Sequence, residues 1–452
     1  MKRVLIIAYH FGPTGPVGGF RWFVQSRQLV DAGWTVDVLV EPACTGIDAP
    51  ETREMESTGR FRLFVVPSIQ PGEWLLRIPG WIRNAFLRRN PEGPAADATK
   101  VVSIPALPVW RPGTKPSLST LVSRSLSGLG EYLHLHRWAK DAGRLAEKLA
   151  RECEYRAVIV STPPHFVQEA GIRLRRRAPI PFVADLRDPW ISGLGSTVAY
   201  FDPVTRILGK WHEARLIRSA DVLIHNTPRA AKALRDHWHR GPLPRQVVIG
   251  NGYERLADTG LPDRGVFRVL FGGSLYPFMD VRVLFDACAR LRDTFGLSPE
   301  MFRIEFLGTD PNFAGTTLPD IAAAYGLASH TEVVPAKNRE DAVRHAARAA
   351  VLVAFDFWHR TAVVMKFLDY AQLRGGMLLI GDPDSALGDA ARQLDIDVCD
   401  RDDPDAVATA LVALYQRWNA GYFPDRNDKD GVFDRARRIR ELQCLLDEVK
   451  GS

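Results

Sequence analysis

The sequence AFDFWHRTAVVMKFLDYAQLRGGMLLIG, residues 354–381, is the stretch that we expect to hold the ligand of this chain. An apolar run over Val351–Phe355 leads into it, and a loop with Arg360 and Thr361 follows. A short helical segment then connects this loop to a second apolar run, Met377–Ile380. Strand, helix and strand in this order predict a βαβ unit. Such units bind ligands at the carboxyl ends of their strands, where the helix start carries free N–H groups, so we expect an anion here.

Two charged residues of the helical segment, Lys366 and Asp369, are three positions apart. A helix places residues with this spacing on one face. An ammonium group suits a phosphate and a carboxylate suits the hydroxyls of a ribose, so the pair is a candidate nucleotide contact. A solvent-exposed Lys–Asp ion pair explains the same residue types equally well.

With 46% hydrophobic side chains, the composition is that of a globular protein. A chain of 452 residues is too long for a single hydrophobic core, so we expect about two or three domains. The 59 Lys and Arg residues against 53 Asp and Glu permit anionic ligands but require no nucleic acid, and we expect none. The five cysteines are far apart and never form a C-x-x-C pair, which predicts a reduced, cytoplasmic location. No apolar segment approaches the roughly 18 residues of a membrane-spanning helix.

The N-terminal region predicts the opening of a doubly wound sheet. Strand Val4–Ala8 precedes a loop with Gly15, Gly18 and Gly19, and a helix and a second strand follow. Glycines at such a turn let the backbone approach a phosphate closely. The spacing differs from G-x-G-x-x-G, but Glu41 ends the second strand, where a dinucleotide-binding fold has a ribose carboxylate. A nicotinamide enzyme therefore stays as a rival hypothesis.

Two polar clusters follow later strands of this half. The first, TPPH at residues 162–165, follows strand Ala157–Ser161, and the second, DLRDPW at residues 185–190, follows strand Phe182–Ala184. Both should lie on the same rim as the glycine loop, and their prolines stiffen them. The acidic and basic residues of the second cluster fit either substrate contact or an Arg–carboxylate bridge that fixes the loop.

A linker over Arg240–Gly265 precedes a second α/β half, which opens with strand Val266–Phe271 and a glycine loop, Gly272–Tyr276. We therefore predict two Rossmann-like, doubly wound domains that face each other across a cleft, comprising residues 1–245 and 246–428.

Histidine pairs two residues apart, such as His134 and His136, invite a metal interpretation. On a helix such residues point to nearly opposite sides, and no cysteine or carboxylate lies at ligand spacing, so we predict no metal site there. The acidic pairs within Asp395–Asp402 are interpreted as a solvated loop.

The segment Trp74–Arg89 alternates aromatic and aliphatic residues with arginines. It could lie in a membrane interface, as a peripheral contact at the inner membrane face, or hold an amphiphilic acceptor. Pro79-Gly80 interrupts it, and ordinary packing fits it equally well.

Six motifs in order, VLIIAYHFGPTGPVGG, STPPHF, PFVADLRDPW, IGNGYE, VLFGGSLY and MKFLDYAQLRGGMLLIG, resemble the bacterial GT-B glycosyltransferases of family 4. The likeness covers nearly the whole chain and is greatest for the subgroup with an aspartate–(Leu/Phe)–Arg–Asp–Pro–Trp loop and a Lys-x-x-(Glu/Asp)-Tyr helix. It implies a deep interdomain cleft, a C-terminal helix within residues 429–452 that crosses back to the first domain, and retaining, metal-independent transfer from a nucleotide-diphosphate sugar. The acceptor would be a glycan, a lipid-linked molecule or a small secondary metabolite, and no cofactor is expected.

The resemblance also implies roles for individual residues. Those assigned to the donor's diphosphate and ribose are Gly15, Gly18, Gly19, Gly273, Ser274, Lys366 and Asp369. The histidine that relatives place near the donor sugar has its nearest counterpart in His165, and Asp188 is the candidate for orienting the acceptor nucleophile.

Two departures from the family pattern leave other functions open. Thr361 stands where many relatives have the first glutamate of a Glu-x7-Glu motif, and Ser274 and Asp280 replace an arginine and a lysine that neutralise phosphate. Arg360, Arg282 or Arg187 could supply that charge. A sugar-nucleotide epimerase and a donor-binding protein without turnover therefore remain alternatives.

Overall fold

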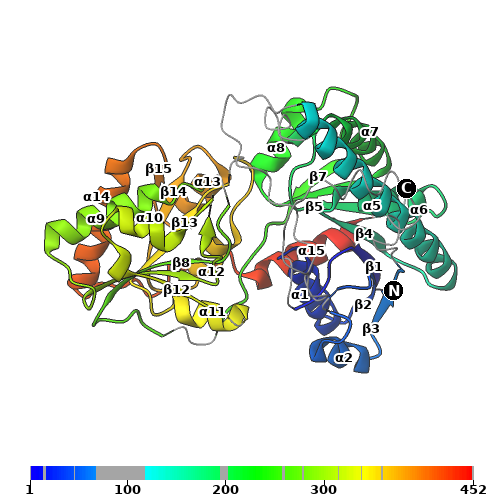
Figure 1. Cartoon of the computed structure of the whole chain (residues 1–452). Coiled ribbons are helices and arrows are strands. Elements are labelled where there is room, and N and C mark those ends of the chain that lie inside the picture. Colours follow the sequence, from blue (N-terminus) through cyan, green and yellow to red (C-terminus); the bar gives the residue numbers. More distant parts are fainter. Residues whose placement is uncertain are drawn as a thin grey trace.

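The computed structural model describes residues 2–13, 17–44, 46–67, 118–193, 202–256, 260–276, 279–313, 315–336, 338–357 and 360–449. These residues form two α/β domains that lie side by side (Figure 1). Each domain has one wholly parallel central sheet with helices on both faces.

The first domain is built on a seven-stranded sheet. Its strands, in spatial order, are β3 (Phe61–Val65), β2 (Thr35–Val40), β1 (Arg3–Ala8), β4 (Ala157–Thr162), β5 (Phe182–Leu186), β6 (Val222–His225) and β7 (Arg245–Val248). Its helices are α1 (Val17–Asp31), α2 (Pro50–Ser57), α5 (Leu118–Glu152), α6 (Glu169–Arg175), α7 (Pro203–Ser219) and α8 (Pro228–His237), with a 3-10 turn, η1 (His165–Gln168).

The second domain has a six-stranded sheet. Its strands, in spatial order, are β12 (Thr331–Val334), β9 (Phe302–Leu307), β8 (Phe267–Gly272), β13 (Val351–Phe355), β14 (Gly376–Gly381) and β15 (Val398–Asp400). Its helices are α9 (Arg282–Phe295), α10 (Leu318–Ala324), α11 (Arg339–Ala346), α12 (Met365–Ala371), α13 (Ala386–Arg392) and α14 (Pro404–Asn419). A short hairpin, β10 (Asn312–Phe313) and β11 (Thr316–Thr317), and a 3-10 turn, η3 (Ala328–His330), complete it.

Alternation along β1 explains why helices cover both faces of the first sheet. Leu5 and Ile7 point into a core shared with α5, α6 and α7, whereas Val4 and Ile6 point into a core shared with α1. Successive side chains of a strand lie on opposite faces, and all four are fully buried. A continuous apolar strand of this kind is stable only between two layers of helices.

A last helix, α15 (Arg435–Glu448), returns from the second domain to the first (Figure 1). Leu442 and Leu446 enter the same core as Val4 and Ile6. The Arg156 side chain fixes the helix end by donating from Nε to the Leu446 carbonyl, over 2.8 Å. The two domains are therefore joined by two chain crossings, before β8 and before α15.

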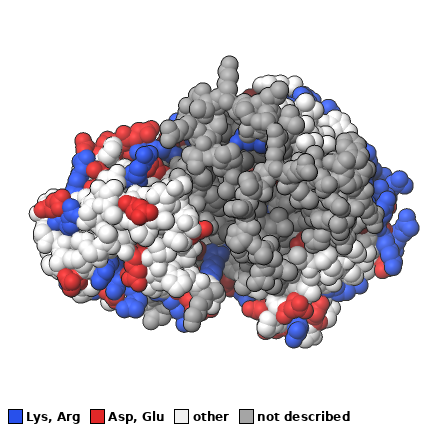
Figure 2. Space-filling view, viewed as in Figure 1, with Lys and Arg blue, Asp and Glu red and all other residues white. Residues whose placement is uncertain are grey.

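The predicted boundary at residues 245 and 246 is wrong by a few residues. It falls inside β7, which pairs in parallel with β6 and so belongs to the first sheet. Gly18 and Gly19, which were predicted to lie in the loop before the first helix, lie in the first turn of α1, because this helix starts at Val17. Among the described residues, no helix has both the length and the apolar character needed to cross a membrane. On the face in Figure 2, their acidic and basic side chains are interspersed.

Candidate active site

Both sheets reverse their strand order once, and parallel sheets bind ligands at such positions. In the first domain the reversal lies between β1 and β4, and in the second between β8 and β13. The loops that follow these strands carry most of the residues predicted from the sequence. Two predicted positions, Gly15 and the segment Trp74–Arg89, lie outside the described residues.

The first aspartate of the DLRDPW loop, Asp185, is fully buried and anchors α1 to the sheet. Its carboxylate accepts hydrogen bonds from Trp22 Nε1 at 2.7 Å, Ser161 Oγ at 3.0 Å and Arg21 Nη2 at 3.4 Å. A carboxylate with this many internal donors is satisfied by the protein itself. Asp188 is partly exposed, and its carboxylate has no hydrogen-bond or ion-pair partner among the described residues, so it is the carboxylate of this loop that can meet a substrate.

Arg187 fixes the loop, but not through the Arg–carboxylate bridge considered from the sequence. Its Nε donates to the Thr162 carbonyl at 3.0 Å and its Nη2 to the Pro163 carbonyl at 2.9 Å. The guanidinium therefore ties the loop after β5 to the loop after β4. Burial lowers the pKa of Arg187, although Asp188 and Asp185 act in the opposite direction.

His165 lies against the same loop. Its Nε2 is 3.1 Å from the Asp188 carbonyl oxygen, and its ring stacks on Trp190 with centres 5.1 Å apart. Burial lowers the pKa of His165, and the nearby Arg187 adds to this effect. The imidazole is therefore neutral near pH 7 and donates to the Asp188 backbone, which fixes the orientation of that residue.

A second histidine, His10, joins this rim and was not predicted. It follows β1 by two residues, and its pKa is lowered to about 4 by burial and by the charge of Arg187. Close packing of the same loop explains Gly19, because a Cβ there would lie 2.9 Å from the Phe11 nitrogen and 3.1 Å from the His10 carbonyl carbon. In the sequence, only its position in the loop directly after the first strand marks His10 as a candidate site residue.

In the second domain, Lys366 meets the glycine turn after β8. Its Nζ donates to the Ser274 carbonyl at 3.1 Å and lies 4.3 Å from the centre of the Phe271 ring. Gly273 has a φ of +82°, a conformation that favours glycine, and a Cβ there would lie 3.8 Å from Lys366 Cε. Desolvation lowers the pKa of Lys366 to about 8, partly opposed by Asp369.

Asp369 lies on α12 as predicted, but its carboxylate is paired with the Arg339 guanidinium of α11. That guanidinium also lies 4.5 Å from the centre of the Phe20 ring, which belongs to α1 of the first domain. Arg435, at the start of α15, lies 4.8 Å from the same ring. Burial lowers the pKa of Arg435 to about 10, and the neighbouring Arg339 contributes to this shift.

The loop after β13 contacts the first domain. The Thr361 carbonyl accepts a hydrogen bond of 2.5 Å from Thr227 Oγ1, whose side chain also caps α8. Arg360 is exposed and pairs with Asp382 at 2.5 Å and Asp384 at 3.5 Å. In this structure both predicted residues therefore have protein partners.

Arg21 is the second important residue that the sequence analysis missed. It is almost fully buried, and it donates to Asn251 Oδ1 at 2.8 Å and to the Ile249 carbonyl at 2.9 Å. Together with Phe20, Met365 and Arg435, it lines a small pocket between the domains. Arg21 is one of two arginines in α1, and the local sequence does not distinguish it for such a role.

Comparisons with known proteins agree with this architecture. No protein-family model and no curated protein matches the sequence. Among solved structures, the trehalose-6-phosphate synthase OtsA matches with a TM-score of 0.59 and 12% identity over 100% of both chains. Anabaena HepE, solved with UDP and glucose, gives a TM-score of 0.59 and 12% identity over 99% of this chain and 100% of its own.

A third solved structure is WaaG, a glycosyltransferase involved in lipopolysaccharide biosynthesis, with a TM-score of 0.55 and 11% identity. The match covers 99% of this chain and 100% of WaaG. The chain thus has the two-domain, Rossmann-like architecture of the GT-B glycosyltransferases, as expected from the sequence.

Proposed function

We propose that this protein is a glycosyltransferase that transfers a sugar from a nucleotide-diphosphate donor. The observation that carries this proposal is the position of Lys366, whose partly desolvated ammonium group lies at the glycine turn of Gly273 and Ser274. A diphosphate bound here would compensate the Lys366 ammonium group for the hydration that it loses on burial. Arg21, Arg339 and Arg435 add positive charge between the domains, which favours an anionic ligand there.

The solved structures guide the choice of donor. The E. coli trehalose-6-phosphate synthase was solved with UDP-2-fluoro glucose, and HepE with UDP and glucose. Uridine diphosphate and UDP-glucose are therefore the first probes to test. Together with the six sequence motifs, this similarity supports a family 4-type, retaining hexosyltransferase.

On the first domain, Asp188 would orient the acceptor nucleophile, with His165 and Arg187 holding its backbone and loop. The leaving diphosphate would be stabilised by fixed positive charges and by backbone N–H groups, without a divalent ion. Such preorganised charges act most strongly where water is excluded, as between closed domains. The acceptor is proposed to be a glycan, a lipid-linked molecule or a small metabolite in the cytoplasm, with Trp74–Arg89 as a candidate contact to it or to a membrane surface.

A thermal-shift screen of nucleoside diphosphates and sugar nucleotides tests the donor proposal first. A ligand at a hundred times its Kd should stabilise the folded state by about 2.7 kcal/mol. A turnover assay follows, in which release of the nucleoside diphosphate must depend on an added acceptor. Conversion of the sugar nucleotide without an acceptor would instead identify an epimerase, and binding without turnover a non-catalytic protein.

A further inference from the structure

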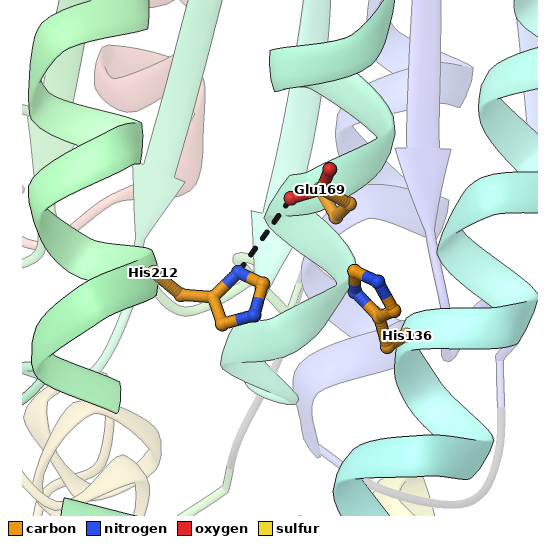
Figure 3. A group of neighbouring side chains, drawn as sticks. All are labelled: His136, Glu169 and His212. Atoms are coloured by element: carbon orange, nitrogen blue, oxygen red, sulfur yellow. Dashed lines mark ion pairs between the residues drawn. The ribbon is translucent and has the colours of Figure 1, made fainter. Parts of the chain in front are cut away.

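A cluster of titratable side chains lies in the first domain, on the face of its sheet that α5, α6 and α7 cover. It consists of His136 from α5, Glu169 from α6 and His212 from α7, and we call it the His–Glu–His cluster. One ligand atom from each residue lies within 4.8 Å of those of the other two. Figure 3 shows the three side chains converging from three helices.

One nitrogen of the cluster is free to bind a metal ion. His136 Nδ1 is buried, and among the described residues it has no hydrogen-bond partner. Glu169 supplies a carboxylate beside it. The cluster therefore offers one carboxylate and an imidazole nitrogen with a free lone pair.

Neighbouring groups hold the three side chains in place. His212 Nε2 lies 3.3 Å from the Tyr132 hydroxyl, which leaves its Nδ1 facing Glu169 Oε2 at 3.5 Å. The Tyr132 ring stacks on His136 with centres 5.2 Å apart. A hydrogen bond to the outer nitrogen of a histidine fixes the orientation of its ring, which is the role of the groups behind metal ligands.

Arg215 contacts Glu169 directly and opposes a cation. Its Nη2 donates to Glu169 Oε1 at 2.8 Å, and its Nη1 lies 2.7 Å from Oε2. Each carboxylate oxygen has two lone pairs, so these contacts leave acceptor capacity on the side that faces the histidines. The guanidinium charge would lower the affinity for a metal ion without blocking its coordination.

We propose that the His–Glu–His cluster binds one divalent transition-metal ion, with Zn²⁺ as the best fit. Two imidazole nitrogens and one carboxylate are a ligand set that Zn²⁺ accepts, with water in the fourth position. The three ligands come from three helices, so the ion would link α5, α6 and α7. No ligand belongs to the candidate active site.

The cluster contacts the loop after β5, which carries Asp188, and a bound ion would therefore have a structural role. The Phe166 ring lies 5.4 Å from His212 and 5.9 Å from Trp190, measured between ring centres. Glu213, next to His212, accepts hydrogen bonds from the Ser192 backbone nitrogen at 3.0 Å and from its hydroxyl at 2.6 Å. Metal binding should therefore stabilise the loop that carries Asp188.

Calorimetric titration of EDTA-treated protein with ZnCl₂ at pH 7 tests the proposal. We expect one equivalent to bind and to raise the melting temperature. His136→Ala should weaken this binding by at least about tenfold, because it removes a ligand at a partly exposed position. His134→Ala is the matched control, since His134 lies on the same helix but hydrogen-bonds to the Tyr9 hydroxyl instead. Equal Zn²⁺ affinity of the two variants would overturn the proposal.

Glu169→Gln gives an independent measurement. Glutamine keeps the shape and an acceptor for Arg215 but removes the negative charge, so Zn²⁺ affinity should again fall by at least about tenfold. Co²⁺ in place of Zn²⁺ should produce visible absorption bands in the wild type that are lost in this variant. No binding to the wild-type protein, or unchanged bands in Glu169→Gln, would show that the cluster is a polar network of the core without a metal.

Discussion

Replacing Lys366 by alanine tests the proposed diphosphate site directly. The Lys366 ammonium group donates a hydrogen bond to the Ser274 carbonyl and lies over the Phe271 ring. A phosphate oxygen would form a charge-assisted hydrogen bond with it. Losing such a bond should weaken nucleoside diphosphate binding by about 1.5–3 kcal/mol, or roughly ten- to 150-fold in Kd.

The lowered pKa of Lys366 adds a dependence on pH. A bound diphosphate favours the charged ammonium and so raises this pKa above the value of about 8 in the free protein. Below pH 8 the group is already protonated, and affinity should not change with its titration. Above pH 8 binding must take up a proton, so wild-type affinity should fall by up to about tenfold per pH unit.

Isothermal titration calorimetry with UDP between pH 7.5 and pH 9 measures both effects. The Lys366→Ala variant should bind UDP weakly at pH 7.5. Its affinity for UDP should not fall further at higher pH, because the ammonium group that titrates there is absent. Lys366→Arg is a useful control, because its charge persists over the whole range. If alanine leaves the affinity unchanged at pH 7.5, Lys366 does not face the diphosphate and the proposed site is wrong.

Three further predictions concern metal, turnover and acceptor. EDTA should leave the transfer rate unchanged well below the melting temperature, since cationic side chains replace a divalent ion at the diphosphate; an absolute requirement for Mn²⁺ or Mg²⁺ would refute this. Asp188→Asn should reduce turnover while calorimetry still detects donor binding, and wild-type kcat in this variant would exclude the orienting role. Replacing Trp81 and Phe86 by alanine should raise the acceptor KM without changing donor affinity. If the variant uses a short, water-soluble acceptor as well as the wild type does, and the wild type does not bind liposomes, the segment Trp74–Arg89 serves only ordinary packing.

Much of the architecture was predictable because it depends on contiguous residues. A continuous apolar run such as Val4–Ala8 can only be buried on both faces, and alternation with helices then requires a parallel sheet. The same reasoning placed Lys366 and Asp369 on one helix and put the glycine turns at strand ends. The predicted boundary at residue 245 falls inside β7, which lies at the edge of its sheet and is only partly buried.

Pairing between distant side chains was not predictable from local pattern. Asp369 was expected to be free for a ribose, but the packing of α11 beside α12 brings Arg339 to it. Arg21 is one of several polar residues in α1, and only the docking of α1 against β5 explains its contact with Asp185. These contacts depend on how helices cross the sheet, which periodicity along one element does not contain.

The two histidines of α5 show most clearly which features the sequence determines and which depend on the tertiary structure. The sequence alone established that His134 and His136 point to different sides of a helix, and the structure agrees, since His134 contacts Tyr9 and His136 stacks on Tyr132. What the sequence could not contain is the arrival of Glu169 and His212 from two other helices. Spacing along one chain segment fixes which residues share a face, because helix geometry is local. Which groups meet across that face is decided only when the helices pack on a common sheet.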